Sequence, residues 1–129
     1  MKVLVCGGRN FGESLQCEES AQERKYIYKI LSGLNQQYSF TQLIHGGASG
    51  ADTCAGHWAA AMKVNVHVFP ADWNKYGKIA GVIRNREMLI HGNPSIVVAF
   101  PGGKGTRNMI DQARKAGVEV LEYKYPVKL

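Results

Sequence analysis

Three glycine-rich segments of this 129-residue chain have the residue types and spacing of phosphate-binding loops. Each follows a run of apolar residues typical of a strand, and two lead directly into segments with helical spacing. Glycine lets the backbone approach an anion closely, and the free N–H groups at a helix start attract negative charge. The segments are Gly7-Gly8-Arg9, residues 45–52 and residues 100–106.

Three such segments at one edge of a sheet favour a shared ligand over three unrelated turns, so we predict a binding site there. Ser49 and Thr106 stand at or beside a helix start, where a hydroxyl either caps the helix or contacts a phosphate. The predicted ligand contacts in these segments are Gly8, Arg9, Gly46, Gly47, Ser49, Asp52, Pro101, Gly102, Gly103, Gly105 and Thr106.

Several side chains near these segments have two interpretations each. Arg9 either contacts a phosphate or ribose or points into solvent. Asp52 either complements the dipole of its helix or holds a ribose hydroxyl. Trp73 and Tyr76 either stack on a base or close over the core. His45 has no second His or Cys at ligand spacing, so we expect no metal site and no resident cofactor.

The segment at 79–91 places an arginine in an apolar stripe. On a helical wheel Arg86 falls between Ile79, Ile83 and Ile90. Because an unpaired charge is costly to bury, Arg86 either reaches the ligand or forms an internal salt bridge. We therefore count Arg86 among the ligand-binding candidates and as the candidate for a catalytic role.

The elements that must position these residues alternate along the chain. Apolar runs predict strands at residues 2–6, 42–45, 64–69, 95–100 and 118–123. Helical spacing predicts helices at residues 20–37, 51–63, 79–91 and 107–116. This order predicts a single α/β domain over residues 1–129, a Rossmann-like three-layer sandwich with a five-stranded, mainly parallel sheet. The three glycine segments then share one sheet edge, joined there by long loops at 7–19 and 70–78.

Taken together in chain order, these motifs resemble the SLOG superfamily, and they are most similar to its YspA/cpYpsA-related branch over nearly the whole chain. The motifs are Gly7-Gly8-Arg9, residues 45–52 with Trp58, residues 69–73, residues 81–88 and residues 100–106. The resemblance implies a nucleotide or nucleotide-derived ligand, often in a sensing or signalling role. It also implies that the pair Arg84-Asn85 lies close to the pocket, the alternative being a solvated arginine and a helix-capping asparagine.

One departure from the superfamily concerns catalysis. The similar Lonely Guy phosphoribohydrolases carry a catalytic glutamate three residues after the threonine of the PGGxGT motif. Here Met109 occupies that position, next to Asn108. Without a carboxylate to stabilise a developing oxocarbenium ion, hydrolysis of an N-glycosidic bond is disfavoured but stays open.

Composition limits the cellular setting. The net charge of +6, from 16 Lys and Arg against 10 Asp and Glu, suits an anionic partner. The chain has an odd number of cysteines, and no two of them have CxxC spacing: Cys6, Cys17 and Cys54. This pattern argues against a disulfide framework and against a zinc site. The amino terminus runs straight into a strand pattern rather than a signal peptide, and the apolar runs are too short to span a bilayer. We expect a cytoplasmic protein with no membrane partner.

These observations favour binding, by sensing or sequestering, of a nucleotide-derived and phosphate-bearing ligand such as an ADP-ribose-like or cyclic nucleotide signal. The alternative is a nucleotide N-glycosidase or phosphoribohydrolase. A second alternative is single-stranded DNA binding, which the superfamily's DNA-processing members suggest. Basic residues are scattered without interleaved aromatics, so a nucleic-acid partner is disfavoured. The resemblance implies a homo-oligomer, and we expect a dimer.

Overall fold

The computed structural model describes residues 1–13 and 18–125, which form a five-stranded sheet with helices on both faces. Cys17 and part of the loop predicted at 7–19 lie outside the described residues. The strands are β1 (Lys2–Cys6), β2 (Gln42–His45), β3 (Asn65–Val68), β4 (Ile96–Ala99) and β5 (Glu119–Glu122). The helices are α1 (Glu18–Tyr38), α2 (Ala51–Ala61), α3 (Trp73–Tyr76), the 3-10 turn η1 (Gly77–Ile79), α4 (Ala80–Gly92) and α5 (Lys104–Lys115).

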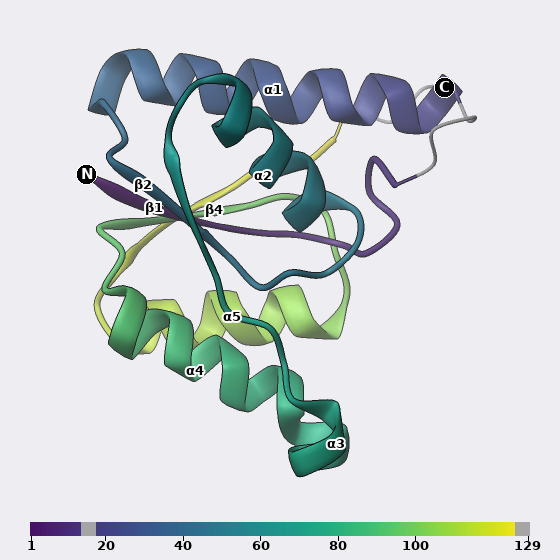
Figure 1. The fold of residues 1–129 in the computed structure, drawn as a ribbon, viewed down its shortest axis with the longest axis vertical. Helices are drawn as coiled ribbons and strands as arrows, with labels where there is room; N and C mark the ends of the chain where they lie inside the picture. Colours follow the sequence, from purple (N-terminus) through teal and green to yellow (C-terminus); the bar gives the residue numbers. More distant parts are fainter. Residues whose placement is uncertain (14–17, 126–129) are drawn as a thin grey trace.

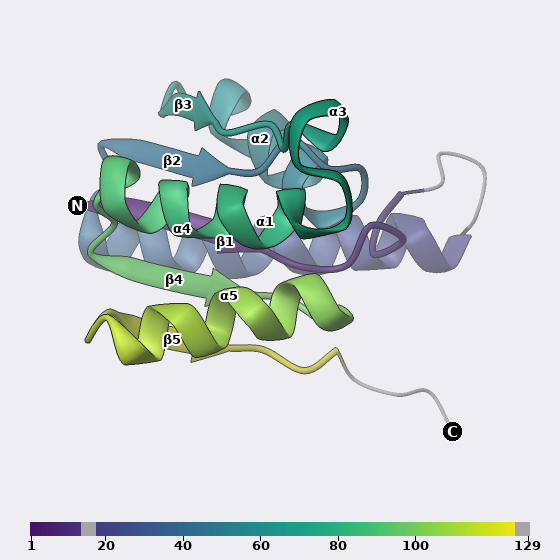
Figure 2. The same cartoon turned by 90° about the horizontal axis from the view of Figure 1, so that it is seen from below.

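The strand order is β3-β2-β1-β4-β5, and all four neighbouring pairs are parallel (Figure 2). The chain runs outward from β1 to β3 on one side, then returns to β4 on the other side of β1. The switch point therefore lies between β1 and β4, where an open α/β sheet binds its ligands. The predicted α/β class and Rossmann-like arrangement are confirmed, and the sheet is entirely parallel.

Helices α1 and α2 cover one face of the sheet, and α4 and α5 cover the other (Figure 1). Alternate residues of the central strands pack on these opposite faces. Val3 and Val5 of β1 face α1 and α2, whereas Leu4 and Cys6 face α4 and α5. All of these side chains are buried, as a strand with helices over both faces requires. The predicted apolar runs of the central strands are explained by these two cores.

The edges of the predicted elements shift for local reasons. The α5 helix starts at Lys104, three residues earlier than predicted, because the glycines at its start do not prevent helical geometry. The predicted loop at 70–78 contains α3 and η1, and the side chain of Asp72 accepts a hydrogen bond from the Lys75 N–H at the start of α3. All four residues of β3 are exposed, since β3 is an edge strand. No helix in the described part of the chain is long and apolar enough to cross a membrane.

Most of the apolar stripe predicted at residues 79–91 faces solvent, and Ile83 is half-buried, so the predicted environment of Arg86 is wrong. Ile79 and Ile90 are more than half exposed, and Arg86 between them is exposed as well. The buried face of α4 instead carries Ala80, Asn85, Met88 and Gly92. Small residues allow close approach to the sheet: a Cβ on Gly92 would lie 3.0 Å from the Ile44 side chain. Arg86 therefore needs no buried partner.

Candidate functional site

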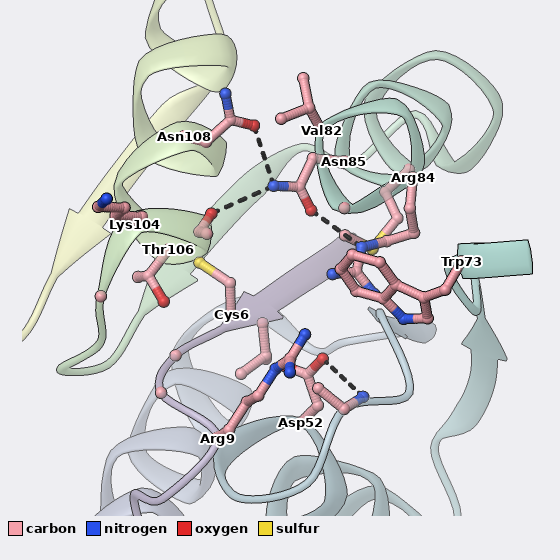
Figure 3. A pocket seen from close by; sticks show the side chains of 18 of the residues that line it. Cys6, Arg9, Asp52, Trp73, Val82, Arg84, Asn85, Lys104, Thr106 and Asn108 are labelled. Carbon is pink, nitrogen blue, oxygen red and sulfur yellow. Dashed lines mark hydrogen bonds between the residues drawn. The ribbon is translucent and has the colours of Figure 1, made fainter. Parts of the chain in front are cut away.

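A cavity of about 480 Å³ opens at the carboxyl ends of β1 and β4, between α4 and the start of α5 (Figure 3). This volume is within the range of small-molecule sites. Nine of the predicted residues line it: Gly8, Arg9, Asp52, Trp73, Arg84, Asn85, Gly103, Gly105 and Thr106. The cavity therefore joins all three glycine segments to α4 and α3.

Backbone hydrogen bonds of one glycine hold the three loops together. The Gly8 N–H donates to the Pro101 carbonyl at 2.8 Å, and the Gly8 carbonyl accepts from the Ala51 N–H at 3.1 Å. The loops approach so closely that a Cβ at Gly50, which has φ +74°, would overlap the Gly8 carbonyl. A Cβ at Gly102 would lie 2.7 Å from the Gly8 nitrogen. Glycine at these positions therefore allows the close contact between the loops, which a side chain would prevent.

The start of α5 presents unpaired backbone donors to the cavity. The N–H groups of Lys104, Gly105 and Thr106 have no acceptor among the described residues, and the N-cap Gly103 supplies none. The first turn of α5 contains no acidic residue and begins with a lysine. A cation at this end of a helix is unfavourable unless an anion is nearby. This end of α5 is therefore suited to bind an anion from outside the protein.

The start of α2 differs because its first turn contains Asp52. This buried carboxylate accepts hydrogen bonds through Oδ2 from the N–H groups of Gly46 at 3.1 Å and Ala48 at 3.3 Å. Burial raises the pKa of Asp52 to about 6, against the lowering effect of those N–H groups and of Arg84. Its second oxygen, Oδ1, has no hydrogen-bond partner in the described structure and borders the cavity. Asp52 thus fixes the loop and keeps one acceptor for a ligand hydroxyl.

A network of polar contacts joins α4 to the loops on both sides of the cavity (Figure 3). Arg84 donates to the Gly46 carbonyl at 2.6 Å and to Asn85 Oδ1 at 3.0 Å. The Asn85 amide donates to the Gly105 carbonyl at 3.2 Å and to Asn108 Oδ1 at 3.1 Å. Partial burial lowers the pKa of the Arg84 guanidinium below its ordinary value. Both residues therefore position the loops as well as line the cavity.

Arg9 lies over the face of the Trp73 indole, with 5.4 Å between Cζ and the ring centroid. Within the described structure its guanidinium forms no hydrogen bond or ion pair. Trp73 is 48% exposed and borders the cavity opposite Thr106 and Lys104 (Figure 3). Trp73 therefore lies at the cavity wall and does not close over the core. Stacking on a base stays a prediction.

A second cavity, of about 270 Å³, adjoins the first. The two cavities share Arg9, Ala48, Trp73 and Arg84. The remaining lining of the second consists of small or uncharged residues: Gly46, Gly47, Ser49, Pro70 and Ala71. His45 fixes this loop, because its Nδ1 accepts the Gly47 N–H at 2.9 Å while burial and Arg84 lower its pKa.

The sequence model of the YspA, cpYpsA-related SLOG family matches residues 1–76. The chain belongs to this SLOG family. The Gene 61 protein of Mycobacterium phage D29 is 42% identical over 88 residues, a match that covers 63% of this chain and 70% of the phage protein. The match to the SLOG family includes the loops after β1 and β2, while Arg84-Asn85 and the glycine loop before α5 lie beyond the matched residues.

Some residues predicted for the site of this SLOG protein lie elsewhere. Arg86 is exposed on the solvent side of α4 and lines neither cavity described above. Tyr76 also lies outside both, with Lys75 Nζ 5.1 Å from its ring centroid. Pro101 and Gly102 line a different cavity, which lies beside β5. Arg86 therefore has no contact from which a catalytic role could follow.

Other cavity residues were missed by the sequence interpretation. Lys78 and Lys104 add two cations, and Asn108 adds an amide. Met109 is fully buried in the core below α5, so the residue that faces the cavity from this turn is Asn108. Cys6 lies at the cavity floor, where burial and nearby Asp52 raise the pKa of its thiol far above the ordinary range. No group of three or more His, Cys, Asp or Glu in the described ranges could hold a metal ion.

Proposed function

We propose that this SLOG protein binds a nucleotide-derived, phosphate-bearing ligand in the cavity between α4 and α5. The observation that carries the proposal is the start of α5, where three unpaired N–H groups and Lys104 meet no protein carboxylate. Around the cavity, Arg9, Lys78 and Arg84 add positive charge against the single carboxylate of Asp52. A phosphate at α5 would satisfy these donors through charge-assisted hydrogen bonds.

The rest of the cavity suits the nucleoside part of such a ligand. The free Oδ1 of Asp52 can accept a hydrogen bond from a ribose hydroxyl. The exposed indole of Trp73 offers a flat apolar surface for a base. The reduced, buried thiols of Cys6 and Cys54 are consistent with function in the cytoplasm, in a sensing or sequestering role.

The test compares AMP with adenosine by isothermal titration calorimetry. AMP should bind and adenosine should bind at least tenfold more weakly, because only AMP carries the phosphate that α5 recognises. Lys104→Glu should weaken AMP binding at least tenfold. Lys115→Glu makes the same charge change at the far, exposed end of α5 and should leave the affinity within twofold. Equal binding of AMP and adenosine, or equal effects of the two variants, would exclude the α5 site.

Hydrolysis of the N-glycosidic bond is the alternative activity for the same site. Among the described residues that line the cavity, Asp52 is the only carboxylate that could stabilise an oxocarbenium ion. Free adenine released from AMP by the wild type, but not by Asp52→Asn, would establish this activity. Single-stranded DNA binding would instead appear as affinity for an oligonucleotide that falls steeply as salt concentration rises.

We also propose that the protein self-associates through α4. The helix exposes Ile79, Val82 and Ile90 in one stripe, and a second copy related by a twofold axis presents the same stripe. Sedimentation should show a dimer for the wild type and a monomer for Ile90→Glu; a monomeric wild type would refute the proposal.

A further inference from the structure

Two cavities meet at the side chains of Arg9 and Trp73. The larger cavity reaches from the start of α5 to Trp73, and the smaller continues beyond Trp73 between the loops at 46–49 and 70–71. Both side chains line both cavities, and the Arg9 guanidinium lies over the indole at this junction. The Arg9 guanidinium contacts the indole and is attracted to the nearby Asp52 carboxylate without a hydrogen bond or ion pair to it (Figure 3), and an exposed cation–π contact is weak. A ligand can therefore displace Arg9 from the Trp73 ring at small cost.

The cations around these cavities fall into two separate groups. The first group lines only the larger of the two cavities: Lys104 at the start of α5 and Lys78 in η1. Arg9 and Arg84 line both cavities and stand where these join. Beyond them, the smaller cavity has an uncharged lining of glycine, alanine, serine and proline. This order predicts a ligand with an anion at one end, a second anion in the middle and an uncharged unit at the other end.

We propose that the ligand is a dinucleotide, in which two nucleosides are joined through a phosphate. Its terminal phosphate binds at the start of α5 and its first nucleoside fills the larger cavity. The linking phosphate pairs with Arg9 and Arg84, and the second nucleoside enters the smaller cavity and contacts Ser49 and the backbone at Gly46 and Gly47. This inference rests on the proposed function and deepens it.

Ala71 provides the variant that separates the two cavities, because it lines the smaller one and not the larger. A phenylalanine at this position fills the space assigned to the second nucleoside. The start of α5 lies at the opposite end of the site and stays intact. Val120→Ala, a change of side-chain size on β5 at a residue that lines neither cavity, serves as the control.

The experiment measures the affinities of AMP and of the 5′-phosphorylated dinucleotide pApA by calorimetry. The wild type should bind pApA at least tenfold more tightly than AMP. Ala71→Phe should abolish that advantage without changing the affinity for AMP, and Val120→Ala should preserve it. Arg9→Gln should weaken pApA binding more than AMP binding, since only pApA has the linking phosphate that is proposed to pair with this guanidinium.

Tryptophan fluorescence adds an independent readout. The chain has two tryptophans, and Trp58 is buried away from the cavities, so a change on binding reports Trp73. The pApA ligand should change the emission in wild type and in Val120→Ala. Equal affinities for AMP and pApA, or an undiminished pApA advantage in Ala71→Phe, would overturn the dinucleotide proposal while the phosphate site stands. Binding of neither ligand would overturn both proposals.

Discussion

Removal of the Asn85 side chain tests whether this residue is the link between α4 and the glycine loop. The amide is buried and makes three hydrogen bonds: it accepts one from Arg84 and donates to Gly105 and Asn108. Each neutral bond contributes about 1 kcal/mol to stability, and the bond to the charged arginine contributes somewhat more. Since Arg84 is partly exposed, we expect Asn85→Ala to lower the free energy of unfolding by about 3 kcal/mol.

The assay is urea-induced unfolding followed by circular dichroism, with thermal unfolding as a check. A loss of that size corresponds to a fall in Tm of about 10 °C for a domain of this length. Asn108→Ala removes the bond from Asn85 and also the bond that Asn108 Oδ1 accepts from Gln112 at 2.7 Å, and it should cost about 1–2 kcal/mol. In the double variant the two losses should not add, because the bond between Asn85 and Asn108 can be lost only once.

Two results would refute this role of Asn85. A loss below about 0.5 kcal/mol for Asn85→Ala would mean that water replaces its contacts without cost, as at ordinary surface positions. Strictly additive losses for Asn85→Ala and Asn108→Ala would mean that the two amides are not coupled. Either result would remove α4 from the set of elements that position the start of α5.

Three further changes test the loops and the cavity floor. The pKa of the Asp52 carboxyl is raised from 3.8 to about 6, so the folded state binds this proton more tightly than the unfolded state does. The free energy of unfolding should therefore fall by up to about 3 kcal/mol as pH rises from 4 to 6. Asp52→Asn should flatten this pH dependence. Gly102→Ala should cost about 1–3 kcal/mol in urea unfolding through overlap with the Gly8 loop, whereas Gly103→Ala, with open space around its Cβ, should cost little. Cys6 should resist iodoacetamide at pH 8 in the folded protein and react after unfolding, as mass spectrometry would show.

The sheet and its glycine loops were predictable from the sequence because buried parallel strands leave continuous apolar runs. The environment of Arg86 was not, since a helical wheel finds an apolar stripe without revealing which side the sheet covers. On α4 the sheet side carries Ala80, Asn85 and Gly92, which a hydrophobicity pattern does not register as core. Small and polar residues there reflect close packing and the cavity wall, and the isoleucines are left to the outer side.

The role of the two helix starts was also beyond sequence reasoning. The glycine segments before α2 and α5 look alike, and both were predicted to meet a phosphate. The sequence placed Asp52 at the start of α2 with two possible roles, and only the hydrogen-bond partners show that it fixes the loop before α2 while the donors of α5 stay unpaired. Lys78 was missed because other parts of the cavity lining, such as Thr106 and Asn108, come from a helix distant in sequence.

The bonds that hold the three loops at Gly8 have a consequence for how binding preference can change. They join main-chain atoms of Gly8, Pro101 and Ala51, so they do not depend on the side chains that face the cavity. Substitutions at Arg9 or Trp73 can alter which ligand is accepted while the backbone frame stays in place. Because the backbone holds the loops and the side chains contact the ligand, a few mutations can change the ligand without loss of the fold.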